Sequence, residues 1–232
     1  QSWASSLIPA LNDNGYLVLQ TFYQKSVLDS ALIENYNHEH LTYSFIRPLA
    51  GFFERYGLKL ASAQFIDAKG GSIRLVMQKT TKDVDLDSKT KELLDAERPY
   101  LDEPLLAFSK SSDYISSIST KLLTYFKSQS TPVTSIAAYG TSIGATVFNY
   151  QLGLTNLISE FYDDDTLRQG TFSPGTACPV SKGRTSEMNK YSHCILLAPL
   201  YADKIISNNT NFLRTGGTFV KIRPEFSIVR TA

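Results

Sequence analysis

Cysteine is scarce in this chain of 232 residues, which contains only Cys178 and Cys194. Two cysteines cannot build a disulfide framework, and these two lack the Cys-x-x-Cys spacing of structural zinc sites. Histidine is nearly as scarce, with three in the whole sequence, so we expect no metal site made by this chain alone. These absences exclude the disulfide-rich and zinc-finger classes of protein.

A strong charge of one sign and long apolar runs are also missing. The formal net charge is +1 and no long basic segment occurs, so nothing indicates binding to nucleic acid or to an anionic membrane. No apolar stretch reaches membrane-spanning length, and residues 1–4 lack the charged start and apolar core of a signal peptide. We therefore expect a soluble, cytoplasmic protein with small-molecule partners.

The first part of the chain mixes helical and strand patterns. Apolar residues follow helical spacing over residues 3–11, and residues 16–21 read as a buried strand. A helix is predicted over residues 47–58, with a proline in its first turn and a glycine at its end. Strand patterns at 59–66 and 72–78 are joined through two glycines, so an antiparallel pair is expected.

The second part of the chain alternates strands with helices. Residues 80–104 are charged and polar, as in a mobile connection or an exposed helix, and residues 105–126 carry one apolar helical stripe. Alternation of strand and helix after residue 133 indicates a mainly parallel sheet. We predict an α/β fold with two domains, residues 1–104 and 105–232. The predicted later elements are strands at 133–139, 157–162, 192–198 and 218–222 and helices near 144–152 and 202–212.

Titratable groups are concentrated in residues 36–47, where His38 and His40 flank Glu39. Imidazole exchanges protons near neutral pH, and a neighbouring carboxylate can fix its tautomer or stabilise its cation. His40 is therefore a candidate general base, and Glu39 is the carboxylate that would orient or stabilise its imidazole. Two other interpretations stay open at this point, because the histidines could simply decorate a loop, or both could face one metal ion on a strand. Two ligands are too few for a metal site.

A second candidate site begins with residues 136–145, a buried strand that runs through a small-residue turn into a helix. Such a turn can bind phosphate, because glycine lets the backbone approach and a helix start offers unpaired amide hydrogens. Packing explains the glycines equally well. Asp163 ends the next strand, where an acid either accepts hydrogen bonds from sugar hydroxyls or caps a helix. Tyr201 follows an apolar strand, where loop residues face a ligand.

Three segments resemble the C-terminal portion of sugar C-methyltransferases, which transfer a methyl group from S-adenosylmethionine to a nucleotide-linked 4-keto sugar. Residues 37–41, Asn-His-Glu-His-Leu, correspond to the family's Tyr-His-Glu-His-Leu. Residues 69–74, Lys-Gly-Gly-Ser-Ile-Arg, match His-Gly-Gly-Ser-Leu-Arg, and residues 138–142, Ala-Tyr-Gly-Thr-Ser, match Ala-Tyr-Gly-Ala-Ser. Further segments between residues 169 and 225 follow in the family's order, so the resemblance spans nearly the whole chain.

The resemblance implies a different role for each of the two domains. The first would be the C-terminal part of a Rossmann-like methyltransferase domain, and the second would be an α/β lobe that holds the nucleotide sugar. His40 would remove the proton beside the ketone with Glu39 as its partner, and Tyr36, one place before the family's tyrosine, is the remaining candidate phenol. The expected substrate-binding residues are His38, Arg47, Lys69, Gly71, Ser72, Arg74, Tyr139, Gly140, Thr141, Ser142, Asp163 and Tyr201.

The segments with which the family binds S-adenosylmethionine are largely missing from this sequence. Neither the cysteine-rich zinc region nor the first glycine-rich strand-helix turn of the family occurs here. We therefore expect a fragment or divided portion of a methyltransferase, whose partner would be the N-terminal portion that binds the methyl donor. Two alternatives are a nucleotide-sugar-binding module that has lost methyl transfer and a subunit that only completes another chain.

Overall fold

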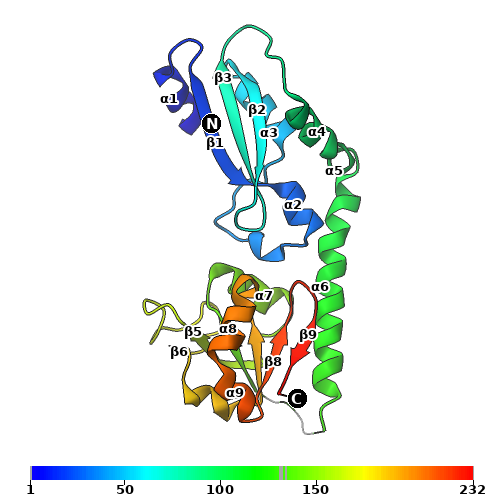
Figure 1. The fold of residues 1–232 in the computed structure, drawn as a ribbon, viewed down its shortest axis with the longest axis vertical. Helices are drawn as coiled ribbons and strands as arrows, with labels where there is room; N and C mark the ends of the chain where they lie inside the picture. The colour runs from blue at the N-terminus through cyan, green and yellow to red at the C-terminus, as the bar shows by residue number, and fades with distance from the viewer. Residues whose placement is uncertain (1, 131–132, 134, 232) are drawn as a thin grey trace. The chain divides into compact units, whose positions relative to one another are not determined.

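The computed structural model describes residues 2–130, 133 and 135–231. The chain divides into two compact units (Figure 1). Unit 1 comprises Gln1–Leu32 and His38–Ser112, and unit 2 comprises Ile33–Asn37 and Asp113–Ala232. The fold is α/β, as predicted, with a small antiparallel sheet in unit 1 and a mainly parallel six-stranded sheet in unit 2. The boundary expected at residue 104 falls at the first residue of helix α6 (Pro104–Lys127).

Unit 1 is built on the strands β1 (Tyr16–Phe22), β2 (Leu58–Ile66) and β3 (Ser72–Lys79), in the order β1-β3-β2. Leu17 of β1 faces the core, but the neighbouring Tyr16 and Val18 are 58% and 57% exposed. The prediction of a strand here is confirmed, but the prediction that the strand is buried is wrong. An apolar run cannot reveal that one face of the antiparallel sheet is open to solvent, so that alternate side chains are exposed.

The helices of unit 1 pack against the face of the sheet that carries Leu17. A buried carboxylate, Glu97, fixes the start of α3 by accepting the backbone N–H groups of Ile46 at 2.5 Å and Arg47 at 3.0 Å. These N–H groups have no partner within the helix, so the carboxylate serves as a cap supplied from elsewhere in the chain. The helices are α1 (Ser2–Leu7), α2 (Gln24–Asp29), α3 (Ile46–Glu54), α4 (Ser88–Ala96) and α5 (Arg98–Asp102), with a 3-10 turn η1 (Ile8–Ala10).

The turn between β2 and β3 requires glycine at Gly71. Its φ of +118° lies in a region that L side chains rarely adopt, and a Cβ there would lie 2.5 Å from Cβ and Oγ of Ser26 in α2. The Gly71 carbonyl also accepts the N–H of Tyr23 at 3.0 Å. The turn is thus packed tightly against the start of α2.

The described residues of unit 2 form a six-stranded sheet in the order β6-β5-β4-β7-β8-β9, parallel except for the last pair. From β4 the chain moves outward to β5 and β6, and then returns to place β7 on the other side of β4. The gap between β4 and β7 is therefore the topological switch point of the sheet. The strands are β4 (Ile136–Tyr139), β5 (Ile158–Asp163), β6 (Val180–Lys182), β7 (His193–Leu196), β8 (Thr218–Lys221) and β9 (Ser227–Val229).

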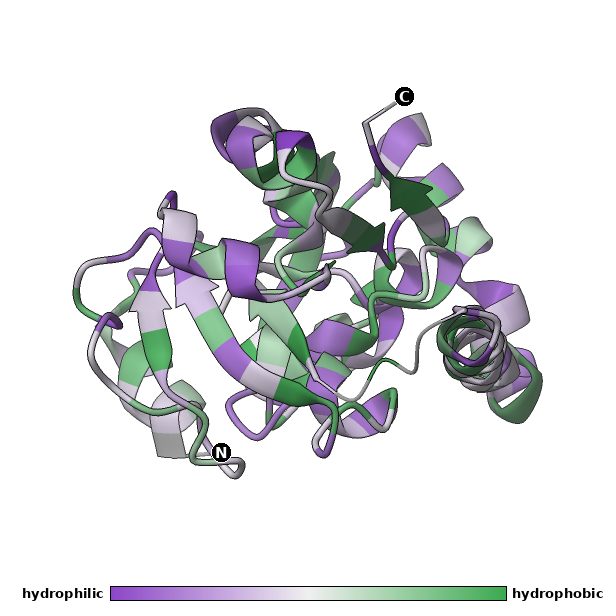
Figure 2. Ribbon diagram, turned by 90° about the horizontal axis from the view of Figure 1, so that it is seen from below, coloured by the Kyte–Doolittle hydropathy of each residue, from purple (hydrophilic) through white to green (hydrophobic). Residues whose placement is uncertain are grey.

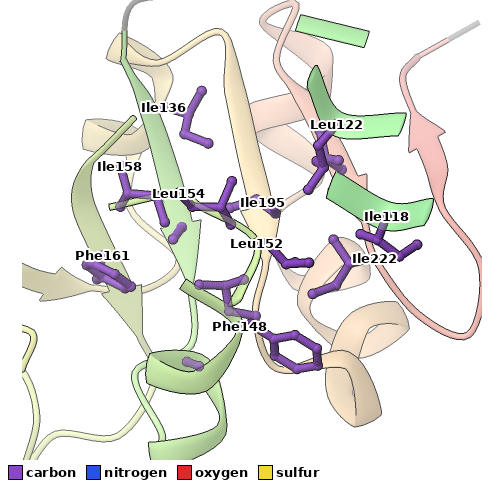
Figure 3. Close-up of a cluster of buried hydrophobic side chains, with 14 of the residues drawn as sticks. Ile118, Leu122, Ile136, Phe148, Leu152, Leu154, Ile158, Phe161, Ile195 and Ile222 are labelled. Atoms are coloured by element: carbon purple, nitrogen blue, oxygen red, sulfur yellow. The ribbon is translucent and has the colours of Figure 1, made fainter. Parts of the chain in front are cut away.

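Helices cover both faces of this sheet. On one face Ile118 and Leu122 of α6 and Phe148 of α7 (Ile143–Gln151) pack with strand residues such as Ile136 and Ile195 (Figure 3). On the other face α8 (Ala202–Asn208) and α9 (Thr210–Arg214) pack on the alternate strand residues. The single helix predicted at 202–212 is thus two helices. The 3-10 turns of this unit are η2 (Ile33–Asn35), η3 (Ser186–Lys190) and η4 (Pro199–Tyr201).

Helix α6 is amphipathic rather than apolar all round. Figure 2 views it nearly along its axis and shows hydrophilic and hydrophobic residues on it. Its buried residues include Ile118 and Leu122, which are 3% and 2% exposed, whereas Leu123 is 59% exposed. None of the helices in the described part of the chain has the length and apolarity needed to cross a bilayer.

A hydrogen-bonded chain of side chains lies at the amino end of β7. Arg230 Nη2 donates to the Tyr125 hydroxyl at 2.8 Å, and the Tyr125 oxygen lies 2.9 Å from Nε2 of the buried His193. His193 Nδ1 lies 2.8 Å from Ser192 Oγ. Because Arg230 can only donate, the Tyr125 oxygen is its acceptor, and the hydroxyl hydrogen remains available for Nε2 of His193. Burial, and then the charge of Arg230, lower the pKa of His193.

We predict that Gly71→Ala destabilises the protein by roughly 2 to 5 kcal/mol, because the added methyl group is strained at positive φ and overlaps Ser26. Gly51→Ala is the matched control, since nothing lies within 4 Å of a Cβ at Gly51 in α3. It should stabilise the protein by about 0.5 to 1 kcal/mol. Urea unfolding of both variants measures the difference, and an equal effect of the two substitutions would contradict the packing described here.

We predict that the stability of unit 2 falls as the pH drops below 6.5, the ordinary pKa of histidine. In that range the unfolded chain takes up a proton at His193 that the native chain, with its lowered pKa, does not bind. The free energy of unfolding, followed from neutral pH to a pH of about 5, should decline less steeply in His193→Gln than in the wild type. His38→Gln, a change at an exposed position, should keep the wild-type slope; identical slopes for all three proteins would refute the assignment.

Candidate functional site

A cavity of about 450 Å³ opens in unit 2 at the carboxyl ends of three neighbouring strands. Its wall includes Tyr139 and Gly140 after β4, Asp163 at the end of β5, and Leu197 and Ala198 after β7. This position is the switch point of the sheet, where open α/β folds place their ligands. Five of the residues predicted to bind substrate therefore line one cavity: Tyr139, Gly140, Ser142, Asp163 and Tyr201.

The turn after β4 is shaped by contacts within the protein. Gly140 has a φ of +101°, and a Cβ there would lie 2.8 Å from Cβ of Ala198. The Thr141 N–H and Oγ1 donate to Asp163 Oδ2 at 2.9 Å and 2.5 Å, and Ser142 Oγ accepts the N–H of Ala145 at 3.3 Å as the cap of α7. Thr141 and Ser142 therefore hold the turn and the helix start in place.

Asp163 is the centre of this arrangement. It is 7% exposed, and it accepts the N–H of Asp165 at 2.9 Å and Arg168 Nη1 at 3.2 Å in addition to the two donors of Thr141. Burial alone would raise the pKa of Asp163, but the hydrogen bonds from Thr141, Asp165 and Arg168 lower it overall. The carboxylate is thus ionised at neutral pH and fully engaged within the protein.

Asp164, the residue after Asp163, is bound by Tyr139 and Arg184. Tyr139 Oη donates to Asp164 Oδ1 at 2.6 Å, and Arg184 donates to Asp164 Oδ2 from Nη2 at 2.8 Å and from Nε at 3.2 Å. Gly183 makes this approach possible, because a Cβ there would overlap the Tyr139 hydroxyl. Burial and the hydrogen bond to Asp164 raise the pKa of Tyr139, so its phenol stays protonated at neutral pH.

Part of the cavity wall is apolar. Leu200 and Tyr201 of η4 are 71% and 63% exposed, and Phe148 and Ile205 lie in the wall with them. Large exposed apolar side chains at a cavity mouth suit a flat, partly apolar ligand group. We call Leu200 and Tyr201 the apolar shelf.

Sequence reasoning missed four charged residues of the cavity wall: Glu34, Arg168, Arg184 and Lys204. Glu34 comes from η2, far away in sequence, and lies 3.5 Å from Arg223; burial raises its pKa and Arg223 opposes that rise. Arg168 and Arg184 follow β5 and β6 in loops, and Lys204 is in the first turn of α8. For Arg168 and Arg184 the available signal was a position shortly after a strand end. No motif marks Glu34 or Lys204.

Residues 38–45, which carry both histidines, belong to unit 1 and have no regular secondary structure apart from turns. His38 and Glu39 are exposed, and the ring of His40 stacks on Phe22 with centroids 4.6 Å apart and planes at 24°. Phe22 is paired with Ser72 across β1 and β3. His40 therefore lies at the end of the small sheet where the turn of residues 69–71 also lies.

Tyr36 and His40 lie in different units. Tyr36 belongs to the segment Ile33–Asn37, which is part of unit 2, and its side chain packs against the core on one face of the larger sheet. The sequence places these two residues four positions apart, but the boundary between the units falls between them. The phenol of Tyr36 thus has a packing role in unit 2.

Three other predicted binding residues, Arg47, Ser72 and Arg74, have side-chain partners within unit 1. Arg47 Nε donates to the Leu94 carbonyl at 3.0 Å, and Arg74 donates to Gln20 Oε1 from Nη2 at 2.9 Å. Ser72 Oγ donates to the Ala68 carbonyl at 3.1 Å and closes the turn that contains Lys69 and Gly71. Among the residues that the structure describes, no group of three or more His, Cys, Asp or Glu side chains could hold a metal ion.

Comparison with known proteins agrees with the family resemblance of the sequence. Residues 67–224 match the family model of the C-methyltransferase C-terminal domain, which is more than half of the chain. The C-methyltransferase NovU of Streptomyces niveus is 24% identical over 220 residues, which are 94% of this chain and 52% of that protein. The chain thus spans about half the length of this relative. The protein belongs to the C-methyltransferase C-terminal domain family.

Proposed function

We propose that unit 2 binds a nucleotide-linked 4-keto sugar and that this chain works as part of a C-methyltransferase. The observation that carries the proposal is the cavity at the switch point, which combines an apolar shelf with cationic side chains in a member of this family. The shelf suits a nucleotide base, and cationic side chains suit phosphates.

The apolar shelf provides the first test. We predict that Tyr201→Ala lowers the affinity for a nucleotide sugar roughly five- to a hundredfold, because stacking of a base on an aromatic ring contributes about 1 to 3 kcal/mol. Tyr201 is 63% exposed, so its loss should leave the fold intact. Tyr16→Ala, at a tyrosine of unit 1 that is 58% exposed, is the matched control. Titration calorimetry with uridine and thymidine diphosphate sugars measures the affinity of both variants. If Tyr201→Ala binds these sugars as tightly as Tyr16→Ala does, the apolar shelf does not bind the base.

His40 is the proposed general base. A proton beside a ketone becomes acidic as an enolate forms, so an imidazole at the C–H and hydrogen-bond donors at the ketone oxygen lower the barrier together. His40 is held by its stacking on Phe22 and remains partly exposed, with Glu39 next to it in the sequence. These features support a side chain that is oriented yet accessible.

The methyl donor in this proposal is S-adenosylmethionine, which would supply the methyl group to the enolate carbon. The residues present here do not fit it. The glycine turn of unit 1 is filled by protein, since Cβ atoms at Gly70 and Gly71 would lie 2.6 Å from Leu32 and 2.5 Å from Ser26. We therefore assign methyl-donor binding to a portion of the enzyme outside this sequence and derive no step through it.

The partner portion would complete the small sheet of unit 1. In the described part of the chain β1 pairs with β3 alone, so one edge of β1 is open, and the side chains of Tyr16 and Val18 are exposed on the face opposite Leu17. Open strand edges and exposed apolar side chains are suited to strand addition. About half of NovU lies outside the matched region, which is enough protein to supply such a portion.

For the base, we predict that His40→Ala slows exchange of the sugar C3 proton with solvent by about 10² to 10⁴ in the complete enzyme. The affinity for the nucleotide sugar should stay within a few-fold of the wild type, because the base contacts the reacting carbon and not the nucleotide. Deuterium incorporation followed by NMR measures the exchange. An unchanged exchange rate would exclude His40 as the base, and a nucleotide sugar that binds without any exchange in the wild type would favour a non-catalytic binding module.

A further inference from the structure

The wall of the cavity carries three acids and three cations, and five of these six side chains are already partnered. Arg168 Nη1 lies 3.2 Å from Asp163 Oδ2, and its Nε lies 3.5 Å from Asp165. Arg184 holds Asp164 through two nitrogens. Glu34 faces Arg223 at 3.5 Å. The six side chains are Glu34, Asp163, Asp164, Arg168, Arg184 and Lys204.

Lys204 is the exception. It makes no ion pair with any residue in the part of the chain that the structure describes, and its side chain lines the cavity. An arginine paired with a carboxylate keeps further N–H donors, but the positive charge of each arginine here is already offset by the acid beside it. An ammonium group without an ion pair can bind an anion directly, so Lys204 provides the surplus positive charge of the cavity.

Lys204 also lies close to the apolar shelf in the fold. It follows Tyr201 by three residues, and a spacing of three places side chains on the same side of a helical turn. Both residues line the same cavity, and both are exposed. A flat ring on Tyr201 would therefore have its attached phosphates within reach of a flexible lysine. This combination matches a nucleoside diphosphate, the carrier part of a nucleotide sugar.

We propose that Lys204 is the phosphate-binding residue of the cavity, and that Arg168 and Arg184 position Asp163 and Asp164 instead of contacting the ligand. This inference rests on the proposed function and adds to it the residue that recognises the diphosphate. It moves the main anion contact away from the turn at residues 140–142 that sequence reasoning favoured. The Thr141 N–H and the Ser142 hydroxyl of that turn are bound within the protein, and Glu34 lies beside the start of α7.

The test compares ligands with and without phosphate on the full chain. Thymidine diphosphate and uridine diphosphate are titrated against the wild type, Lys204→Met, Lys204→Arg and Lys121→Met, with thymidine and uridine as phosphate-free probes. Lys121 is an exposed lysine of α6 without an ion pair in the described structure, and it serves as the matched control. The titrations are repeated at low and high salt, since salt screens an exposed charge contact.

We expect Lys204→Met to lose roughly ten- to a hundredfold in affinity for the diphosphates, as for a charge-assisted hydrogen bond, and to lose most of their salt dependence. Its affinity for the nucleosides should be unchanged, Lys204→Arg should retain most of the affinity, and Lys121→Met should match the wild type. Diphosphate affinity equal to the wild type in Lys204→Met, or an equal loss for nucleosides and diphosphates, would overturn the role of Lys204. A wild-type chain that binds neither the diphosphates nor their sugars would overturn the proposed function itself.

Discussion

The open end of the larger sheet depends on one buried carboxylate, Asp163. Its two oxygens accept hydrogen bonds from Thr141, Asp165 and Arg168, which come from the turn after β4 and from the loop after β5. A buried carboxylate without these donors would be costly, so the two segments and the acid stabilise one another. The cavity has its shape because these segments are tied together at the switch point of the sheet.

This arrangement also decides the charge that a ligand meets. The acids at the strand ends are matched with arginines, so the polar wall is nearly neutral in itself. Lys204 and the apolar shelf then set the character of the remaining surface. In unit 1 the chemistry is of a different kind, because an imidazole stacked on Phe22 is oriented without being deeply buried. The two units thus offer complementary parts of one reaction, binding and proton removal, in the function proposed here.

Much of the fold could be predicted from local patterns. The strand-turn-helix at residues 136–145, the long helix α6 and the antiparallel pair β2 and β3 all follow from periodicity and glycine placement. The exposure of Tyr16 and Val18 could not be predicted, because it depends on which other segments of the chain cover β1, and the residues of β1 do not specify these segments. Likewise Asn209 ends α8 by donating its side-chain amide to the Ile205 carbonyl, a local competition that the apolar spacing conceals.

The sequence by itself determined the α/β class, the family resemblance and the segments that carry chemistry, because each of these depends on residues that are neighbours along the chain. Tertiary structure alone decided that Glu34 joins a cavity made by residues more than a hundred positions later, and that Tyr36 and His40 belong to different units. It also decided which cations are already paired. Ion pairs and cavity walls are formed between distant segments, and their energies depend on distance and burial in space, so no pattern along the chain can specify them.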